Sequence, residues 1–476
     1  MFNTLAYLAP ILLVGALVLG SRLPLLYAGG AGLLATLLAA ALTQQDYWPL
    51  VWTEMLQGAW LALLSGAMVL GGLIFHHTLG SSSGSPDTAP RRPHLHAFVL
   101  CFIAAPVVES AIGFGVGFAV AIGGLLRLGI APLRAAVLSL ASQMLVPWGA
   151  LGIGTLIGAS LVHLPLQGFG FHSALVIAPS LLVMLAWFWR GLDLSGITGD
   201  RRDKFSELVL LLALIGLLIA ANHAGIVDAA GLLATAPLLA LLHWRDALAG
   251  RVAWRLVLPY GLLLGLLLLT RLLPGIASTL QSVLVWRPFP DMPAFPLLHY
   301  AGTLLLFAAL ITLALQGGLA RLPAIATQSW RGGRLSIGAT LLFLIMARLY
   351  AGSGMAAELA MQWNGFAGSL APLGTPLFSG LAGLLTGSNT ASNSLMLPIQ
   401  VALAEQSGMP VLWLAGLQNT TGSLINSLFP GKLALACAFA GIPGQERAVL
   451  RASLGYGGLM LASAMLVALL ILLLNA

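Results

Sequence analysis

Charged side chains are scarce in this sequence. Asp, Glu, Lys and Arg make up only 7% of its 476 residues, and 59% of the residues are hydrophobic. In an average soluble domain roughly a quarter of the residues are charged. Many apolar runs approach or exceed the roughly 20 residues that a helix needs to cross a bilayer. The composition therefore predicts an integral membrane protein.

Cysteine is nearly absent, and metal-binding clusters are missing. Cys101 and Cys437 stand far apart in apolar surroundings, so neither a disulfide framework nor a metal site is expected. Four histidines flank one polar loop, but no Cys or carboxylate cluster accompanies them. We therefore expect solvated side chains and no metal ion at these four positions: His76, His77, His94 and His96.

Signs of nucleic-acid binding and of enzymatic chemistry are also lacking. The formal charge of +7 comes from Arg residues in short loops, a pattern that reflects membrane topology. No basic cluster with interleaved aromatic residues is present. No nucleophile with a neighbouring base and no metal motif is found. We expect no nucleic-acid partner, no enzymatic activity and no cofactor.

The two-residue alternation of outer-membrane barrels is absent, which leaves a helical bundle. We expect an all-α polytopic membrane protein with about 12 transmembrane helices plus two re-entrant helical hairpins in an inverted-repeat arrangement. The first apolar run has no basic segment before it and is expected to be a membrane span and not a signal peptide. The expected spans are 4–20, 24–42, 56–76, 131–163, 172–189, 207–222, 226–243, 256–273, 299–315, 335–350, 410–441 and 449–474.

The stretch from Pro106 to Gly117 places one carboxylate, Glu109, among apolar and glycine residues. The region 97–127 is too interrupted for one helix and too short for two crossings. We therefore expect a re-entrant hairpin with Glu109 at its tip. An ionised carboxylate is costly in hydrocarbon, so Glu109 is expected to face a cavity or a partner. The alternative is a cap on a short half-helix at the interface.

A second polar interruption lies near the other end of the chain. It predicts a re-entrant hairpin at 372–407 with its tip at Thr386 to Asn393. Each hairpin is followed by a proline, Pro132 or Pro410, and a helix that reaches a polar break after a similar spacing. Matching interruptions in two halves point to a transporter's binding site. Chance similarity between two stretches rich in Leu, Ala and Gly is the alternative.

This pattern divides the chain into three parts. Residues 1–190 form an N-terminal repeat half with hairpin 97–127, and residues 191–206 form a cytoplasmic linker that could act as a hinge. Residues 207–476 contain central helices and the C-terminal repeat half with hairpin 372–407. Such an arrangement has the two hairpins entering from opposite sides of the membrane.

Basic residues gather on one side of this arrangement. With the N-terminus outside, most of the 21 Lys and Arg residues lie in the cytoplasm, as the positive-inside rule requires. We expect Arg201, Arg331 and Arg447 on that side and Asp291 and Ala476 outside. Three arginines fall on the outer side: Arg271, Arg287 and Arg348.

Neutral polar residues and glycines gather at the breaks. Unpaired amides and the positive end of a helix dipole attract a carboxylate there, and Ser, Thr and Asn side chains can donate to the same ligand. Any one of these residues is more often a contact between helices, and Lys432 could instead extend to the interface. The expected substrate-binding set is Ser110, Gly113, Gly115, Ser142, Gln143, Ser388, Asn389, Thr390, Ser392, Asn393, Asn419, Thr420, Thr421 and Lys432.

With these residues in view, the chain resembles the L-lactate permease family. Its first block, from Glu109 to Gly115, is similar to the family's Glu-Gly-Ala-Ala-Gly-Phe-Gly block. The similarity continues through 129–136 to the break at 149–152. The second block comprises 385–393, 419–422 and 436–438.

The resemblance implies a secondary transporter in the bacterial inner (plasma) membrane. It implies proton-coupled symport of lactate, glycolate or a related 2-hydroxy monocarboxylate, with Glu109 as the proton-coupling acid. Within the expected set, four residues would lie near the substrate: Ser392, Asn393, Asn419 and Thr420.

Two departures from the family pattern leave alternatives open. The family has Asp where this chain has Asn389, and it has Lys near the position of Asn426. Ser388, Asn389 and Thr390 also resemble the tips of sodium-coupled carboxylate transporters, so sodium is the alternative coupling ion. A channel would need rings of like residues along a pore, which the paired breaks do not suggest. The oligomeric state, including a homodimer, stays open.

Overall fold

The computed structural model describes residues 2–20, 23–43, 48–79, 92–113, 115–244 and 254–475. Within these ranges nearly all residues are helical, and a single two-stranded antiparallel ladder joins β1 (Val285–Trp286) to β2 (Phe295–Pro296). Eight of the described helices are long and apolar enough to cross a membrane, or up to eleven if each bent pair is one span. The expected all-helical membrane fold is confirmed.

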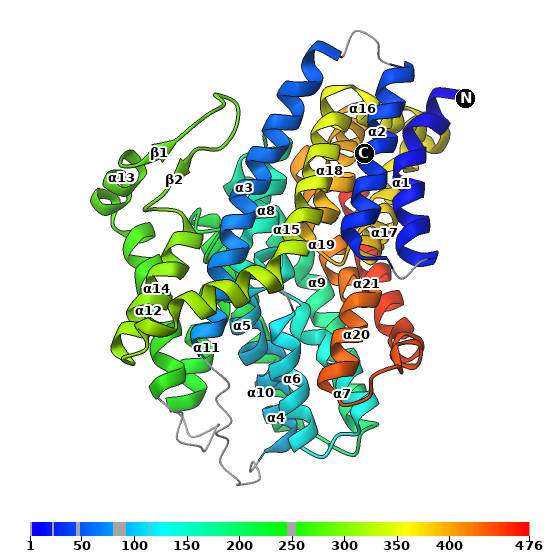
Figure 1. Cartoon of the computed structure of the whole chain (residues 1–476). Helices are drawn as coiled ribbons and strands as arrows, with labels where there is room; N and C mark the ends of the chain where they lie inside the picture. The colour runs from blue at the N-terminus through cyan, green and yellow to red at the C-terminus, as the bar shows by residue number, and fades with distance from the viewer. Residues whose placement is uncertain are drawn as a thin grey trace.

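Three N-terminal helices lie along one flank of the molecule: α1 (Phe2–Gly20), α2 (Leu25–Thr43) and α3 (Trp48–Leu79). α15 (Leu322–Gly352) packs against α2 and α3 and crosses the middle of the view (Figure 1). At Gly58 a Cβ atom would lie 2.7 Å from Ile345 Cα. Glycine therefore allows the backbones of α3 and α15 to approach closely, as is common between membrane helices.

The first predicted hairpin is present as two antiparallel helical arms. One arm consists of α4 (Pro93–Phe98), a π-turn at Val99–Ala104 and α5 (Ala105–Ile112), and the other is α6 (Val116–Arg127). The chain turns at Gly113 and Gly115, whose φ angles are 76° and 74°. Glu109 therefore lies one turn before the tip, and the entry of this hairpin into the membrane stays a prediction.

The helix after this hairpin is broken where the sequence predicted. α7 (Pro132–Leu138) continues through 3₁₀ turns at Ser139–Gln143 and Val146–Trp148 into α8 (Gly149–Leu161), and the two parts meet at 59°. Ala150, Leu151 and Gly152 all have positive φ angles, of 47°, 53° and 66°. Since left-handed backbone is unfavourable for residues with a Cβ atom, surrounding contacts must hold this break.

The C-terminal half repeats both features. α17 (Thr375–Thr386) and α18 (Asn389–Ser407) form the second hairpin around Gly387 and Ser388. α19 (Val411–Ile425), a 3₁₀ turn at Asn426–Leu428 and α20 (Pro430–Phe439) form a second broken helix, bent by 51°. Both interruptions predicted from the sequence are thus found in the structure.

The remaining helices connect and surround these elements. α13 is turned by 91° from α12, and together with β1 and β2 it projects at one side of the molecule (Figure 1). The bounds are α9 (Leu166–Asp193), α10 (Arg201–His223), α11 (Ala230–Trp244), α12 (Trp254–Leu272), α13 (Pro274–Ser282), α14 (Ala301–Leu315), a 3₁₀ turn at Leu319–Arg321, α16 (Met355–Ala367), a 3₁₀ turn at Gly368–Gly374 and α21 (Glu446–Asn475).

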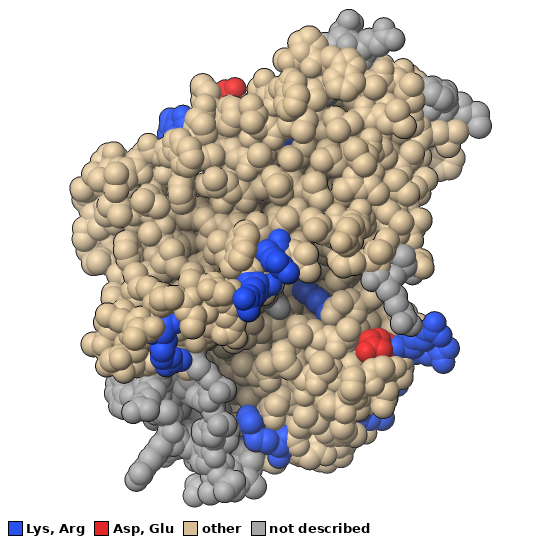
Figure 2. Space-filling model, viewed as in Figure 1, with Lys and Arg blue, Asp and Glu red and all other residues tan. Residues whose placement is uncertain are grey.

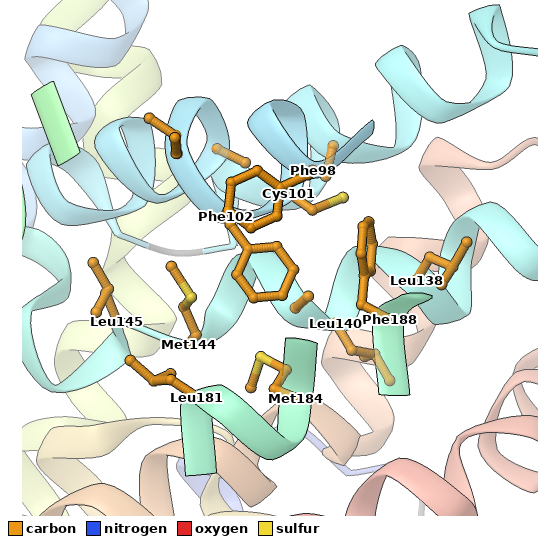
Figure 3. Close-up of a cluster of buried hydrophobic side chains, with 14 of the residues drawn as sticks. Phe98, Cys101, Phe102, Leu138, Leu140, Met144, Leu145, Leu181, Met184 and Phe188 are labelled. Atoms are coloured by element: carbon orange, nitrogen blue, oxygen red, sulfur yellow. The ribbon is translucent and has the colours of Figure 1, made fainter. Parts of the chain in front are cut away.

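An apolar core surrounds the first hairpin. Phe98 and Phe102 stack with ring centroids 4.9 Å apart, and Phe102 meets Phe188 of α9 edge-on at 5.1 Å. Figure 3 shows these rings pointing toward one another beside Cys101. Cys101 is a free thiol, as is Cys437. This packing encloses the hairpin in protein, which a non-crossing segment in a bilayer requires.

The expected linker at 191–206 contacts the base of the first hairpin. Arg92 Nε donates to Asp203 Oδ1 at 2.7 Å. His94 Nδ1 lies 2.7 Å from Glu207 Oε1, and Trp189 Nε1 donates to the other carboxylate oxygen. The expectation of a solvated loop histidine is wrong for His94, which is 1% exposed. A hinge role for the linker stays a prediction.

Candidate functional site

A cavity of about 680 Å³ lies between the two hairpin tips and the two helix breaks. Figure 2 shows a hollow between α15 and the helices α6 and α20, with lysine or arginine atoms inside it. Among the predicted site residues, six line this cavity: Glu109, Gly113, Ser388, Asn389, Thr390 and Lys432. Residues from both hairpins therefore line one cavity, and its use as a binding site stays a prediction.

Glu109 is buried, with 3% of its surface exposed. Its carboxylate accepts hydrogen bonds from the N–H groups of Gly115 at 3.1 Å and Gly117 at 3.0 Å. A Cβ atom at position 117 would lie 3.2 Å from Glu109 Oε2, so glycine permits this approach. The carboxylate thus caps the N-terminus of α6, where the helix dipole favours an anion. It does so at the edge of the central cavity.

Lys432, near the start of α20, joins the two broken helices. Its Nζ donates to Asn426 Oδ1 at 2.8 Å and to Gln143 Oε1 at 3.2 Å. Lys432 also interacts electrostatically with Glu109. Because a lysine offers only donors, it fixes both amides with their oxygen atoms toward Nζ. Lys432 therefore contacts the protein interior, whereas the sequence left an interfacial position open.

The amide nitrogens of these two partners are unsatisfied. Gln143 Nε2, Asn426 Nδ2 and the neighbouring Ser142 Oγ are buried and have no hydrogen-bond partner among the described residues. An unpaired buried donor costs roughly 1–3 kcal/mol. An ammonium group and unpaired amide donors on its partners match the oxygen atoms of a carboxylate. This group of Gln143, Asn426 and Lys432 is called the lysine site below.

Asn426 is absent from the predicted binding set, although it lines the cavity and contacts Lys432. The sequence contained one signal: an Asn in an apolar stretch directly after a polar helix break. Gln143 was predicted, but its contact with Lys432, across 289 positions of sequence, could not be read from the sequence.

Three asparagines form a neutral network behind the second hairpin tip. The Nδ2 groups of Asn389 and Asn393 both donate to Asn419 Oδ1 at 2.9 Å. Asn419 Nδ2 donates to the hydroxyls of Thr155 at 3.0 Å and Ser173 at 2.9 Å. The network joins α18 and α19 to α8 and α9. Asn393 and Asn419 thus act as contacts between helices, and Asn389 also faces the cavity.

Other predicted residues serve local roles. Ser388 Oγ accepts from Ala391 N–H and caps α18. Thr420 Oγ1 donates to Gly416 O in its own helix at 2.8 Å, and Gln418 Nε2 approaches Ser392 Oγ at 3.3 Å. The predicted residues that are not among the described lining of the cavity are Ser110, Gly115, Ser142, Gln143, Ser392, Asn393, Asn419, Thr420 and Thr421.

Comparisons with known proteins agree on one family. A family model described as L-lactate permease matches residues 3–221 and 256–475. The L-lactate permease of Salmonella typhi is 34% identical over 160 residues, which is 32% of this chain and 27% of that protein. The L-lactate permease of Escherichia coli (strain K12) is 33% identical over 159 residues, again 32% and 27% of the two chains.

A related permease and one solved structure also match. The glycolate permease GlcA of Escherichia coli (strain K12) is 30% identical over 183 residues, which is 36% of this chain and 32% of that protein. The matched part of each of these relatives is therefore well under two thirds of its length. The YdaH transporter of Alcanivorax borkumensis has a TM-score of 0.36 at 13% identity, over 88% of this chain and 84% of that chain.

Proposed function

Since this chain belongs to the L-lactate permease family, we propose that it carries lactate, glycolate or a related 2-hydroxy monocarboxylate with a proton across the bacterial inner membrane. The observation that carries the proposal is the lysine site, whose Lys432 and Asn426 line the central cavity together with Glu109. The cation and the unsatisfied donors can bind an anion, and the separate acid can bind a proton.

The substrate carboxylate binds at the lysine site. Lys432 Nζ supplies the positive charge, and Asn426 Nδ2, whose residue also lines the cavity, supplies a hydrogen bond that is otherwise unmade. Gln143 Oε1 holds the ammonium group from outside the lining. Charge-assisted hydrogen bonds of this kind are about twice as strong as neutral ones. Asn389 and Thr390 line the same cavity from the second hairpin and are positioned to meet the 2-hydroxyl group.

The charges of the cavity explain why a proton would accompany the anion. Glu109 and Lys432 together are neutral when the first is ionised and the second protonated. A bound monocarboxylate leaves one excess negative charge in surroundings of low dielectric constant, where like charges repel strongly. A proton on Glu109 removes that charge. Anion binding and protonation therefore favour each other, which is the requirement for symport.

The asparagine network supports a proton more than sodium. Asn419 Oδ1 already accepts two amide hydrogen bonds, and Asn389 Oδ1 accepts one from Ser423 at 2.7 Å. A hard cation needs several free oxygen ligands. Within this network Asn393 Oδ1 alone has no described partner.

The test is uptake of labelled lactate or glycolate into proteoliposomes with either a pH gradient or a sodium gradient. We expect accumulation with the pH gradient alone. Lys432→Met should abolish uptake, whereas Lys204→Met, which removes a surface pair with Asp193 and a contact with the Trp189 ring away from the cavity, should not. Uptake driven by sodium but not by protons would contradict the coupling, and full uptake by Lys432→Met would contradict the site.

A further inference from the structure

A second cavity, of about 500 Å³, lies on the other side of α3 and α8. On α3, Met68 lines the second cavity and the next residue, Val69, lines the central one. On α8, Leu156 lines the second cavity and Ile153 the central one. These two helices therefore form the wall between the cavities.

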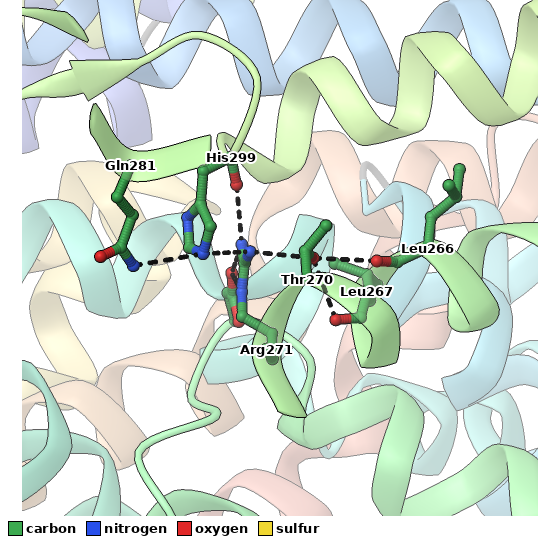
Figure 4. A network of polar contacts seen from close by, with 7 residues as sticks. Leu266, Leu267, Thr270, Arg271, Gln281 and His299 are labelled. Carbon is green, nitrogen blue, oxygen red and sulfur yellow. Dashed lines mark hydrogen bonds and ion pairs between the residues drawn. The ribbon is translucent and has the colours of Figure 1, made fainter. Parts of the chain in front are cut away.

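Arg271, at the end of α12, joins the segments around the second cavity. Its Nη2 donates to Asp228 Oδ2 at 2.5 Å and to His299 O at 3.0 Å. Its Nη1 lies 3.1 Å from Thr270 Oγ1 and 2.8 Å from His299 Nε2, which Gln281 Nε2 also approaches at 3.3 Å (Figure 4). This Arg271 network ties the loop before α11 to α12, α13 and the start of α14.

The ion pair of this network is largely shielded from solvent. The side chains of Arg271 and Asp228 are 11% and 16% exposed. Losing one partner of a shielded pair leaves an uncompensated charge and is costly. The network therefore holds these segments together strongly, but it consists of polar contacts that can reform with another anion.

The loop that carries Asp228 also packs on the break of α8. A Cβ atom at Gly152 would lie 3.2 Å from Val227 O and 3.5 Å from Asp228 Cα. One turn earlier, Trp148 Nε1 donates to Asn222 Oδ1 at the end of α10 at 3.0 Å. Gly149 and Ala150, in the same break, line the central cavity. A change in the break would therefore move the loop that holds Asp228.

We propose that the second cavity is the outer vestibule of the substrate path and that the Arg271 network is the gate that closes it. This inference rests on the proposed transport function. Two cavities separated by a wall of two helices match alternating access around a fixed site. Binding in the central cavity shifts the gate if the ligand prefers one arrangement of the α8 break. When the gate opens, Arg271 exchanges Asp228 for the incoming carboxylate.

The test is the reactivity of a cysteine in the second cavity. Ser160 lines this cavity and is half-buried, so Ser160→Cys is exposed to a membrane-impermeant thiol reagent added outside intact cells. The parent chain is the blank, since both native cysteines are buried. We expect Asp228→Asn, which breaks the ion pair, to raise the labelling rate roughly five-fold or more. Arg271→Gln, which removes the other partner of the ion pair, should raise the labelling rate in the same way.

Ser278→Cys, on the exposed surface of α13 and not among the lining residues, is the matched control and should react equally in all backgrounds. Equal labelling at position 160 with and without the gate substitutions, or labelling from the cytoplasmic side alone, would overturn the proposal. The assay needs no substrate. If the chain carries no lactate but the labelling rate changes, the proposed function is wrong. If the chain transports lactate but the labelling rate does not change, the proposed gate is wrong.

Discussion

A single substitution can separate the observed capping role of Glu109 from its proposed role as a proton carrier. As a cap, its carboxylate accepts two backbone N–H groups of the second hairpin arm. As a proton carrier, it must exist in both charge states during a cycle. A glutamine keeps one oxygen acceptor but cannot gain or lose a proton. Glu109→Gln should therefore retain exchange of labelled for unlabelled anion and lose accumulation driven by a pH gradient.

Both transport modes are measured in the same proteoliposomes. Undiminished pH-driven accumulation by Glu109→Gln would leave the residue as a cap alone, which is the alternative that the sequence left open. Glu358→Gln, in the first turn of α16 and away from the cavity, is the control and should accumulate the anion as the parent does.

Asn389 is one of the two positions at which the chain departs from the pattern of the family that it resembles. Its Nδ2 donates to Asn419 Oδ1 at 2.9 Å. An ionised aspartate at this position would place two acceptors against each other and add a negative charge to the cavity. Asn389→Asp should weaken the apparent affinity for the anion, because like charges repel strongly at low dielectric constant.

Uptake of Asn389→Asp is measured against substrate and against sodium. A tighter dependence on sodium would reveal a cation ligand and contradict the proton assignment. Unchanged kinetics in both titrations would mean that Asn389 only joins helices, like Asn393 behind it. Asn389→Ala, which removes the hydrogen bonds to Asn419 and from Ser423 without adding a charge, separates lost hydrogen bonding from the added charge.

His299 gives the Arg271 network a dependence on pH. His299 lies in the loop before α14. Burial lowers the pKa of its ring below 6.5, and the charge of Arg271 lowers it further, whereas the charge of Asp228 raises it. The neutral ring accepts from Arg271 Nη1. The contact is therefore complete above pH 6.5 and is lost as the pH falls through the lowered pKa, when two cations would face each other.

Acidification slows the labelling of every cysteine because less thiolate is present, so the rate of Ser160→Cys is divided by that of Ser278→Cys at the same pH. This ratio should rise as the outside solution is acidified. His299→Gln keeps a side-chain acceptor without a titrating group, so in that background the ratio should not vary over the same range. A pH response that survives in His299→Gln would assign the effect to another group. The other charged residues of the network are Asp228 and Arg271.

At the scale of elements, both hairpins and both broken helices were predictable because Gly, Pro and small polar residues interrupt runs that are otherwise apolar. The β1–β2 hairpin and α13 were missed. Residues 274–296 contain no strict alternation and too few residues per element for periodicity to indicate a type. The lysine site was only partly predictable, since Gln143 and Asn426 meet Lys432 through the relative bend of two distant helices.

The break in α8 permits a matched pair of substitutions with opposite signs. Ala150 has a φ of 47°, where a Cβ atom costs roughly 1–2 kcal/mol. Glycine removes that strain but adds roughly 0.5–1 kcal/mol of unfolded-state entropy. Ala150→Gly should therefore be neutral or raise the melting temperature slightly.

Gly152→Ala introduces the same strain at a φ of 66°, and its new methyl group would press on Val227 O at 3.2 Å. It should lower the stability by at least roughly 1–2 kcal/mol. Thermal unfolding in detergent checks both variants. Equal melting temperatures of the two variants would contradict the left-handed backbone conformation at positions 150 and 152.

At the scale of the whole molecule, Figure 1 shows the two chain ends and the β1–β2 hairpin toward one end, with α4, α6, α7 and α20 toward the other. Basic residues lie at the second end: Arg134 in α7, and Arg92, directly before α4, which pairs with Asp203 of the linker. This separation agrees with the charge asymmetry of the sequence, although Arg22, Arg91, Arg245, Arg251 and Ala476 lie outside the described residues.

The asymmetry predicts that the first end is outside and the second is cytoplasmic. Asp291, between β1 and β2, and Arg331 and Arg447 are all exposed, so cysteines at these positions can react. In intact cells an impermeant reagent should label Asp291→Cys and leave Arg331→Cys and Arg447→Cys unlabelled until the membrane is permeabilised. Labelling at 331 with protection at 291 would contradict the inverted-repeat arrangement, and labelling at both would mean that the expected span 299–315 between them does not cross the membrane.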